Sequence, residues 1–143
     1  MDYTATEIRE ISDALFNDGK LERLTDVYAE DMVMHNVPAG TDYEGRAAFE
    51  AWIEANRTGY QDFHVEIEDV VIGDQKVVIQ YVVTGTHEGP LPDLDVEPTH
   101  RPVEFHGATV NRVDEGKIAE TWWYYNRLGL LQQLGLVPEQ PTP

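Results

Sequence analysis

The 143-residue chain contains no cysteine, which excludes a disulfide framework, a thiolate metal site and a thiol nucleophile. It contains a single serine, Ser12, which we expect to point away from any site, so a serine triad is not expected. No run of about eighteen apolar residues occurs, and the first residues lack the basic and apolar regions of a signal peptide. We therefore expect a cytoplasmic protein that does not associate with membranes.

Basic residues are also scarce, because ten Lys and Arg oppose 27 Asp and Glu and give a formal net charge of −17. Nucleic acids and anionic membranes bind basic patches, so we expect neither as a partner. The acids are spread along the chain, and only three of the ten basic residues are lysines. Uniform acidity with few lysines indicates a halophilic cytoplasm, where salt screens the self-repulsion of the chain. An ordinary acidic protein from a mesophile is the alternative.

The residues that are present predict helices followed by strands. Apolar residues at helical spacing predict a helix that begins at a Thr4–Glu7 capping box, a second from about residue 21 to 30, and a third from about 45 to 57. A short strand is expected at Met32–Asn36. Two hairpins are expected after the third helix, one formed by strands 63–72 and 77–87 and the other by strands 103–113 and 118–125. These elements indicate one α+β domain, residues 1–143, with helices on one face of a curved antiparallel sheet.

The stretch from Ile118 to Gly135 is a strand that runs into a short helix. Because side chains alternate along a strand, Ile118, Trp122, Tyr124 and Asn126 should share one face. We expect this face to form the wall of a pocket between the sheet and the helices, with Asn126 at its polar end. Asn126 also stands where the helix needs an N-cap.

Trp123 and Tyr125 alternate with these residues and should lie on the outer face of the sheet. Large aromatic side chains on an outer face are uncommon in a monomer, so their presence predicts that a partner covers the face. We expect a homodimer that forms through this surface.

Several other side chains are candidates for the pocket. His35 and His87 lie on strand faces with apolar neighbours, and a pocket role and a structural role are equally open for both. Tyr81, Trp52 and His106 are further candidates for ligand contact. For the aromatic residues, the alternative is a place in the hydrophobic core without ligand contact. The loop from Pro90 to Pro102 should lie at the pocket's mouth. No metal-ligand spacing of histidines and no phosphate-binding loop occurs, so we expect no metal and no cofactor.

The chain resembles the SnoaL-like polyketide cyclases, also called ester cyclases, of the nuclear-transport-factor-2-like superfamily. The matching pieces cover nearly the whole chain in order, and they are Val33–His35, Gly45–Arg46, Asp69–Asp74, Thr84–His87, Arg101–Gly107, Asp114–Ile118 and Leu128–Gly135. The resemblance implies a cone-shaped domain whose open end admits a small, largely apolar molecule, and it also implies a homodimer.

Members of that family that close polyketide rings by intramolecular aldol chemistry use an acidic residue as general acid and base. The resemblance implies that this acid lies two residues before Leu128, where this chain has Asn126, whose amide cannot exchange a proton near neutral pH. Two functions stay open. One is an enzyme for a cyclic or polyketide-like ester or carbonyl compound, with His35 or His87 as proton carrier. The other is a non-catalytic module that binds a small apolar ligand.

The charge of the chain leads to a prediction about salt. We expect the melting temperature to rise steadily between low and molar concentrations of NaCl or KCl, because the folded chain repels itself more strongly than the expanded one. Thermal unfolding monitored by circular dichroism at a series of salt concentrations measures this. A melting temperature that stays flat across the series would favour the mesophile alternative.

Overall fold

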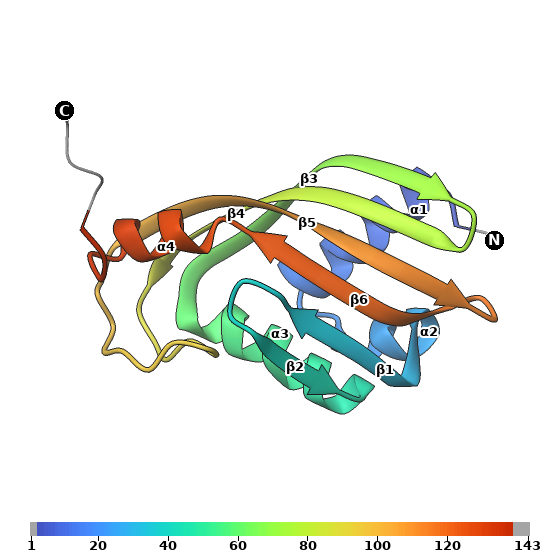
Figure 1. Ribbon diagram of the computed structural model, residues 1–143, viewed down its shortest axis with the longest axis horizontal. Coiled ribbons are helices and arrows are strands. Elements are labelled where there is room, and N and C mark those ends of the chain that lie inside the picture. The colour runs from blue at the N-terminus through green and yellow to red at the C-terminus, as the bar shows by residue number, and fades with distance from the viewer. Residues whose placement is uncertain (1–2, 139–143) are drawn as a thin grey trace.

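The computed structural model describes residues 3–138, so both ends of the expected domain, 1–2 and 139–143, lie outside the described residues (Figure 1). Within this part the chain forms a six-stranded sheet of order β2-β1-β6-β5-β4-β3. The strands are β1 (Tyr28–Asn36), β2 (Thr41–Glu44), β3 (Tyr60–Gly73), β4 (Lys76–His87), β5 (Pro102–Asp114) and β6 (Lys117–Tyr125). The helical segments are α1 (Ala5–Ser12), η1 (Asp13–Asn17), η2 (Leu21–Arg23), α2 (Leu24–Val27), α3 (Arg46–Gly59) and α4 (Arg127–Gln133).

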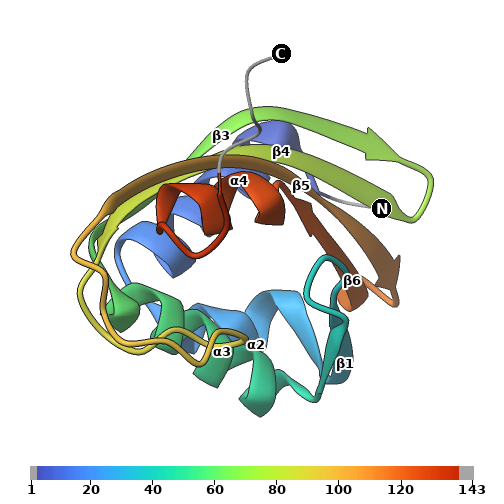
Figure 2. The same cartoon turned by 60° about the vertical axis from the view of Figure 1, so that its left-hand side comes forward.

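The sheet curves over the helices, as the turned view in Figure 2 shows. The two expected hairpins, β3–β4 and β5–β6, are present, and the α+β class with a curved sheet is confirmed. The sheet is not purely antiparallel, however, because β1 runs parallel to β6. Strands joined by a tight turn must run in opposite directions, whereas β1 and β6 are joined only through the rest of the fold. Turn residues in the sequence therefore do not predict that β1 pairs with β6.

Two other boundaries differ from the expectation. The second helix ends at Val27 instead of near Glu30, because Tyr28 already belongs to β1 and pairs with Ile118 on β6. The short strand β2 was not predicted at all. It pairs with β1 through a tight connection, and its four residues are too few to show an alternating pattern.

Side-chain hydrogen bonds fix the first helix to the inner face of the sheet. The capping box is confirmed, since the Thr4 hydroxyl oxygen accepts the N–H of Glu7 at 3.1 Å. At the other end, the Asn17 side chain donates to the carbonyl oxygen of Val65 at 2.9 Å and accepts the Val65 N–H at 2.8 Å. This pair of bonds joins η1 to β3, so the helix covers the apolar face of the sheet.

Gly107 makes room for an aromatic side chain inside the curve of the sheet. It pairs with Tyr81 on β4 and with Tyr125 on β6. A Cβ atom at Gly107 would lie 2.5 Å from the hydroxyl oxygen of Tyr81 and 2.5 Å from the carbonyl oxygen of Tyr124. The inward position of Tyr81, which is 2% exposed, therefore depends on a residue without a side chain.

We predict that Gly107→Ala lowers the free energy of unfolding by about 1–3 kcal/mol, because overpacking displaces neighbouring atoms. Gly73→Ala is the matched control, since a Cβ there would lie 3.8 Å from the carbonyl oxygen of Lys76, an ordinary van der Waals contact. Urea titration of both variants measures the effect. Equal stabilities of the two variants would show that the Tyr81 side chain moves aside at no cost.

Candidate functional site

A cavity lies between the inner face of the sheet and α3. Its volume is about 50 Å³. Its aromatic lining comes from helices and strands alike and consists of Phe16, Trp52, Tyr60, Phe63, Tyr81, Phe105, Trp123 and Tyr125. The loop between β4 and β5 adds Leu91, Pro92 and Leu94. A lining of this kind suits a small, flat and largely apolar molecule.

The polar end of the cavity is built around Asp93, which that loop supplies. One carboxylate oxygen, Oδ1, accepts the hydroxyl proton of Tyr43 at 2.6 Å. The other, Oδ2, accepts from the side-chain amide of Asn36 at 2.8 Å and from the indole N–H of Trp52 at 3.1 Å. The three donors come from β2, β1 and α3, so three elements orient one carboxylate.

Asp93 keeps some capacity to bind a ligand. A carboxylate oxygen can accept two hydrogen bonds, so Oδ1, with one protein donor among the described residues, has an acceptor position left. Asp93 is partly buried and lines the cavity. The site therefore contains an oriented carboxylate in the wall of a cavity that is lined mostly by aromatic and aliphatic side chains.

Tyr125 and Arg127 lie at the same end of the cavity. The Arg127 guanidinium donates to the backbone carbonyl oxygen of Asp93 at 3.4 Å. Burial raises the pKa of the Tyr125 hydroxyl; the neighbouring side chains of Asn36 and Arg127 act in the opposite direction, and the charge of Asp93 adds to the rise. The Tyr125 hydroxyl therefore belongs to the same polar group of side chains as Asp93 and Arg127.

The cavity face of β6 is the opposite of the expected one. Trp123 is 7% exposed and lines the cavity with Tyr125, whereas Tyr124 is 44% exposed and neither it nor Trp122 lines the cavity. The prediction that Trp122 and Tyr124 form the pocket wall is wrong. The prediction that Trp123 and Tyr125 lie on the outer face is wrong for the same reason.

A β-bulge explains the exchange of faces. Arg112 on β5 pairs with Glu120, but the next residue, Val113, pairs with Ile118, so Ala119 is an extra residue on β6. Ile118 points inward and is 2% exposed. After the extra residue the alternation restarts on the other face. A parity counted from Ile118 therefore fails for every later residue of the strand.

The other expected site residues are distributed over the molecule. Trp52 and Tyr81 line the cavity as expected. Asn126 does not, because its side chain accepts the N–H of Gly129 at 2.9 Å and caps α4, which confirms its structural role. His87 is fully buried outside the cavity lining, and His106 is exposed on the outer face.

His87 holds the two ends of the β4–β5 loop together. Its Nδ1 atom accepts the backbone N–H of Thr99 at 3.1 Å, which places the ring proton on Nε2. Its backbone N–H and carbonyl oxygen bond to Arg101 and His100. The ring therefore fixes the loop that carries Asp93.

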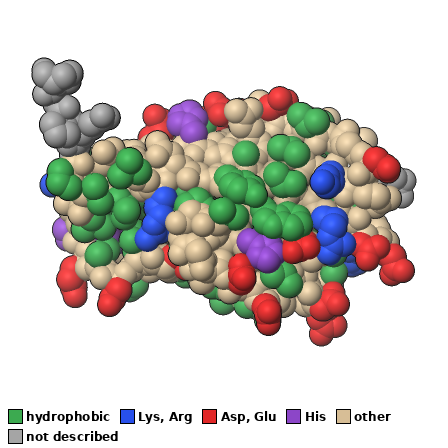
Figure 3. All heavy atoms as spheres, viewed as in Figure 1, with side chains coloured by type: hydrophobic (Ala, Val, Ile, Leu, Met, Phe, Trp, Pro, Cys, Tyr) green, Lys and Arg blue, Asp and Glu red, His purple; other side chains and the backbone are tan. Residues whose placement is uncertain are grey.

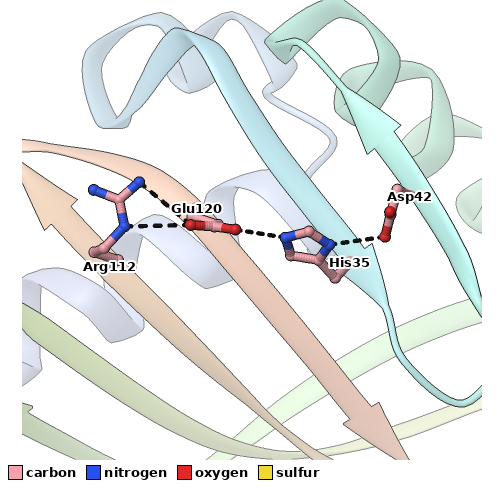
Figure 4. A network of polar contacts seen from close by, with 4 residues as sticks. All are labelled: His35, Asp42, Arg112 and Glu120. Atoms are coloured by element: carbon pink, nitrogen blue, oxygen red, sulfur yellow. Dashed lines mark hydrogen bonds and ion pairs between the residues drawn. The ribbon is translucent and has the colours of Figure 1, made fainter.

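His35 lies on the outer face between two carboxylates (Figure 4). Its Nδ1 is 2.7 Å from an oxygen of Asp42, its Nε2 is 2.6 Å from an oxygen of Glu120, and its ring stacks on Trp122 with centroids 5.3 Å apart. Glu120 also accepts from Arg112 at 3.3 Å. The hydrogen bond to Glu120 raises the pKa of His35 most; partial burial opposes this, and the bond to Asp42 adds to the rise.

The outer face carries an apolar row that crosses the sheet. The register places these side chains next to one another on successive strands, and they are Val71, Val78, Val110, Trp122 and, at the end, His35. Figure 3 shows hydrophobic side chains gathered on this face. The homodimer through the outer face stays a prediction, but Trp123 and Tyr125, on which it was based, line the cavity on the inner face.

Two further properties concern ions and membranes. In the range 3–138, no three His, Asp or Glu side chains are grouped so that they could hold a metal ion. None of the helices within that range has the length and apolarity that a membrane crossing requires.

Comparison with known proteins gives the class of this chain. The model of the SnoaL-like polyketide cyclases matches residues 6–134, and the chain belongs to that family. TsrD from Streptomyces laurentii superimposes with a TM-score of 0.80 at 19% identity, over 95% of this chain and 100% of that one. IdmH from Streptomyces antibioticus gives 0.74 at 27% identity, over 93% and 99%. A protein from Catenulispora acidiphila with a ketosteroid isomerase-like fold gives 0.75 at 23%, over 96% and 100%. No curated protein sequence matches the chain.

The raised pKa of His35 predicts a stability contribution that depends on pH. An unfolded histidine titrates near about pH 6.5, so the contribution of His35 is fully present below that value and is lost as pH rises through the higher folded pKa. We expect the stability difference between wild type and His35→Gln to shrink as pH rises. Urea titrations from about pH 5.5 to about pH 9 measure this stability difference. The range is chosen because it lies above the pKa values of most carboxylates.

The control is His106→Gln, which alters an exposed histidine on the same face that lies 3.6 Å from Glu68. A stability difference between wild type and His35→Gln that is constant across the pH range would contradict an ion pair between a protonated His35 and its carboxylate partners.

Proposed function

We propose that the protein binds a small, largely apolar cyclic or polyketide-like carbonyl compound in the cavity and moves a proton on it with Asp93. One observation carries this proposal. The Asp93 carboxylate is held by three protein donors and faces an aromatic cavity with an acceptor position left over. A general base must be within hydrogen-bond reach of the proton that it removes, and the place of Asp93 in the cavity lining supports this role.

Membership of a polyketide cyclase family supports a carbonyl substrate. Ring closure in a chain of carbonyl groups begins with the loss of a proton from a carbon beside a carbonyl. The reaction therefore needs a base, an apolar space that excludes water, and a group that accepts the negative charge. Asp93 supplies the candidate base, and the aromatic and aliphatic lining supplies the apolar space.

In the proposed reaction, Oδ1 of Asp93 takes a proton from the carbon beside a ligand carbonyl. The electron pair of the broken C–H bond forms an enolate, whose carbon attacks a second carbonyl carbon of the same molecule. A C–C bond forms, and the electron pair of the attacked C=O bond moves to its oxygen. Asp93 returns its proton to that oxygen, so the carboxylate is restored and no oxidant, reductant or cofactor takes part.

The histidine mechanism has less support. His35 lies on the outer face and His87 behind the loop, and neither lines the cavity. A non-catalytic binding module is the second candidate, and Asn126 favours it, because an amide occupies the position where the family resemblance implies an acid. The two candidates differ in whether a bound ketone loses a proton.

Hydrogen exchange in D₂O separates the candidates. We expect wild type to exchange the hydrogens beside the carbonyl of 2-decalone, a bicyclic ketone, faster than buffer does. Asp93→Asn should lower the catalysed rate by about 10²–10⁴-fold, because the amide is not a base, while ketone binding changes little. Mass spectrometry follows the exchange, and calorimetry follows binding.

Asp95→Asn is the matched control, because Asp95 is an exposed acid in the same loop and does not line the cavity. Wild type that binds 2-decalone but exchanges no faster than buffer would overturn the proposal in favour of the binding module. Exchange that persists in Asp93→Asn would show that another group is the base.

A further inference from the structure

Removal of a proton beside a carbonyl leaves a negative charge on the carbonyl oxygen, and a partner for that charge must lie near Asp93. Among the described residues that line the cavity, Arg127 carries the one positive charge. Its single hydrogen bond in this part of the chain is the long one, 3.4 Å, to the backbone oxygen of Asp93. A guanidinium has five N–H donors, so most of the donors of Arg127 are free for a ligand.

The charge of Arg127 is also not neutralised within the described part of the chain. No carboxylate of residues 3–138 forms an ion pair with it, and the carboxylate of Asp93 bonds instead to Asn36, Tyr43 and Trp52. The polar end of the cavity therefore has an anionic side and a cationic side. A dipolar group of a ligand can bridge the two.

Tyr125 stands next to this cationic side. Tyr125 lines the cavity together with Asn36 and Arg127. Its hydroxyl proton donates to no acceptor among the described residues, so the proton is available to a ligand oxygen.

We propose that Tyr125 and Arg127 form an oxyanion subsite, which binds the carbonyl oxygen of the substrate and stabilises the enolate that forms when Asp93 takes the proton. This inference rests on the proposed function of Asp93. It narrows the substrate to a cyclic or polyketide-like ketone with its oxygen at Tyr125 and its acidic C–H bond at Asp93. Donors aimed at a developing charge in a site that excludes water are among the largest contributions to catalysis.

The charges of the site make the proposal testable without turnover. When Asp93 takes the proton, its carboxylate becomes neutral as the ligand oxygen becomes negative. An oxyanion that enters from solution meets an ionised Asp93 in the wild type but a neutral side chain in Asp93→Asn. The neutral variant reproduces the charge of the intermediate state, so it should bind an oxyanion more tightly than the wild type does.

The probe is 2-naphthol, a flat bicyclic molecule whose naphtholate form mimics an enolate. Near neutral pH, Asp93→Asn should bind it at least about tenfold more tightly than wild type, and its absorbance spectrum should show the bound molecule as the anion. Adding Tyr125→Phe or Arg127→Gln to that variant should weaken binding by about 10–100-fold and remove the anion spectrum, because each change deletes a donor to the oxyanion. Fluorescence titration gives the affinities.

Tyr124→Phe is the matched control, since it removes the hydroxyl of the neighbouring tyrosine on the outer face and should leave the anion spectrum unchanged. Thermal melts check that each variant is folded, and Arg127→Gln provides a second test if Tyr125→Phe is not. Naphthol that binds in its neutral form in every variant, or that does not bind at all, would overturn the subsite. An anion spectrum that survives both substitutions would do the same.

The two proposals fail separately. If the Asp93→Asn variant shows no anion spectrum, or if that spectrum survives the substitutions at Tyr125 and Arg127, while ketone exchange depends on Asp93, the subsite is refuted and the base stands. An anion spectrum that depends on Tyr125, with no ketone exchange in wild type, would refute the base.

Discussion

The carboxylate of Asp93 joins four segments that are distant in the sequence. A partly buried carboxylate is stable only when donors replace the water that it loses, and the donors here are Asn36 on β1, Tyr43 on β2 and Trp52 on α3. The dependence is mutual, because Asn36 and Trp52 are themselves almost fully buried and their polar groups also need partners. The β4–β5 loop is therefore held against the cavity by the group that makes the cavity reactive.

Local features of the fold followed from the sequence because their causes are local. The Thr4–Glu7 cap, the hairpin turns and the Asn126 cap each involve residues within a few positions of one another. The assignment of side chains to the two faces of a strand is different, because an error at one residue is carried to every later residue of that strand. One extra residue at Ala119 exchanges the inner and outer faces of all the residues that follow it, and nothing in an alternating run of aromatic residues marks where the extra residue lies.

The site residues show the same division. Trp52 and Tyr81 could be predicted, since each lies on a regular element whose apolar face is clear. Asp93 could not, because it shares its loop with Asp95 and Glu97, and its partners lie between 41 and 57 positions away in the chain. Nor do its neighbours single it out, because all three acids lie between apolar or proline residues. His35 was predicted to lie in the pocket, but it lies on the outer face between Asp42 and Glu120.

In the proposed mechanism, the acid/base residue lies at Asp93 and not at the position of Asn126, and this difference requires no change of fold. The position of Asn126 has a structural duty, capping α4, that Asn and Asp perform equally well, so an acid there can be lost without loss of the helix. A proton carrier can then arise elsewhere, provided that it faces the same cavity. Asp93 does so from the loop, opposite the cationic side at Arg127. In the proposed mechanism the fold of the family is kept, and the base belongs to the β4–β5 loop that lines the cavity.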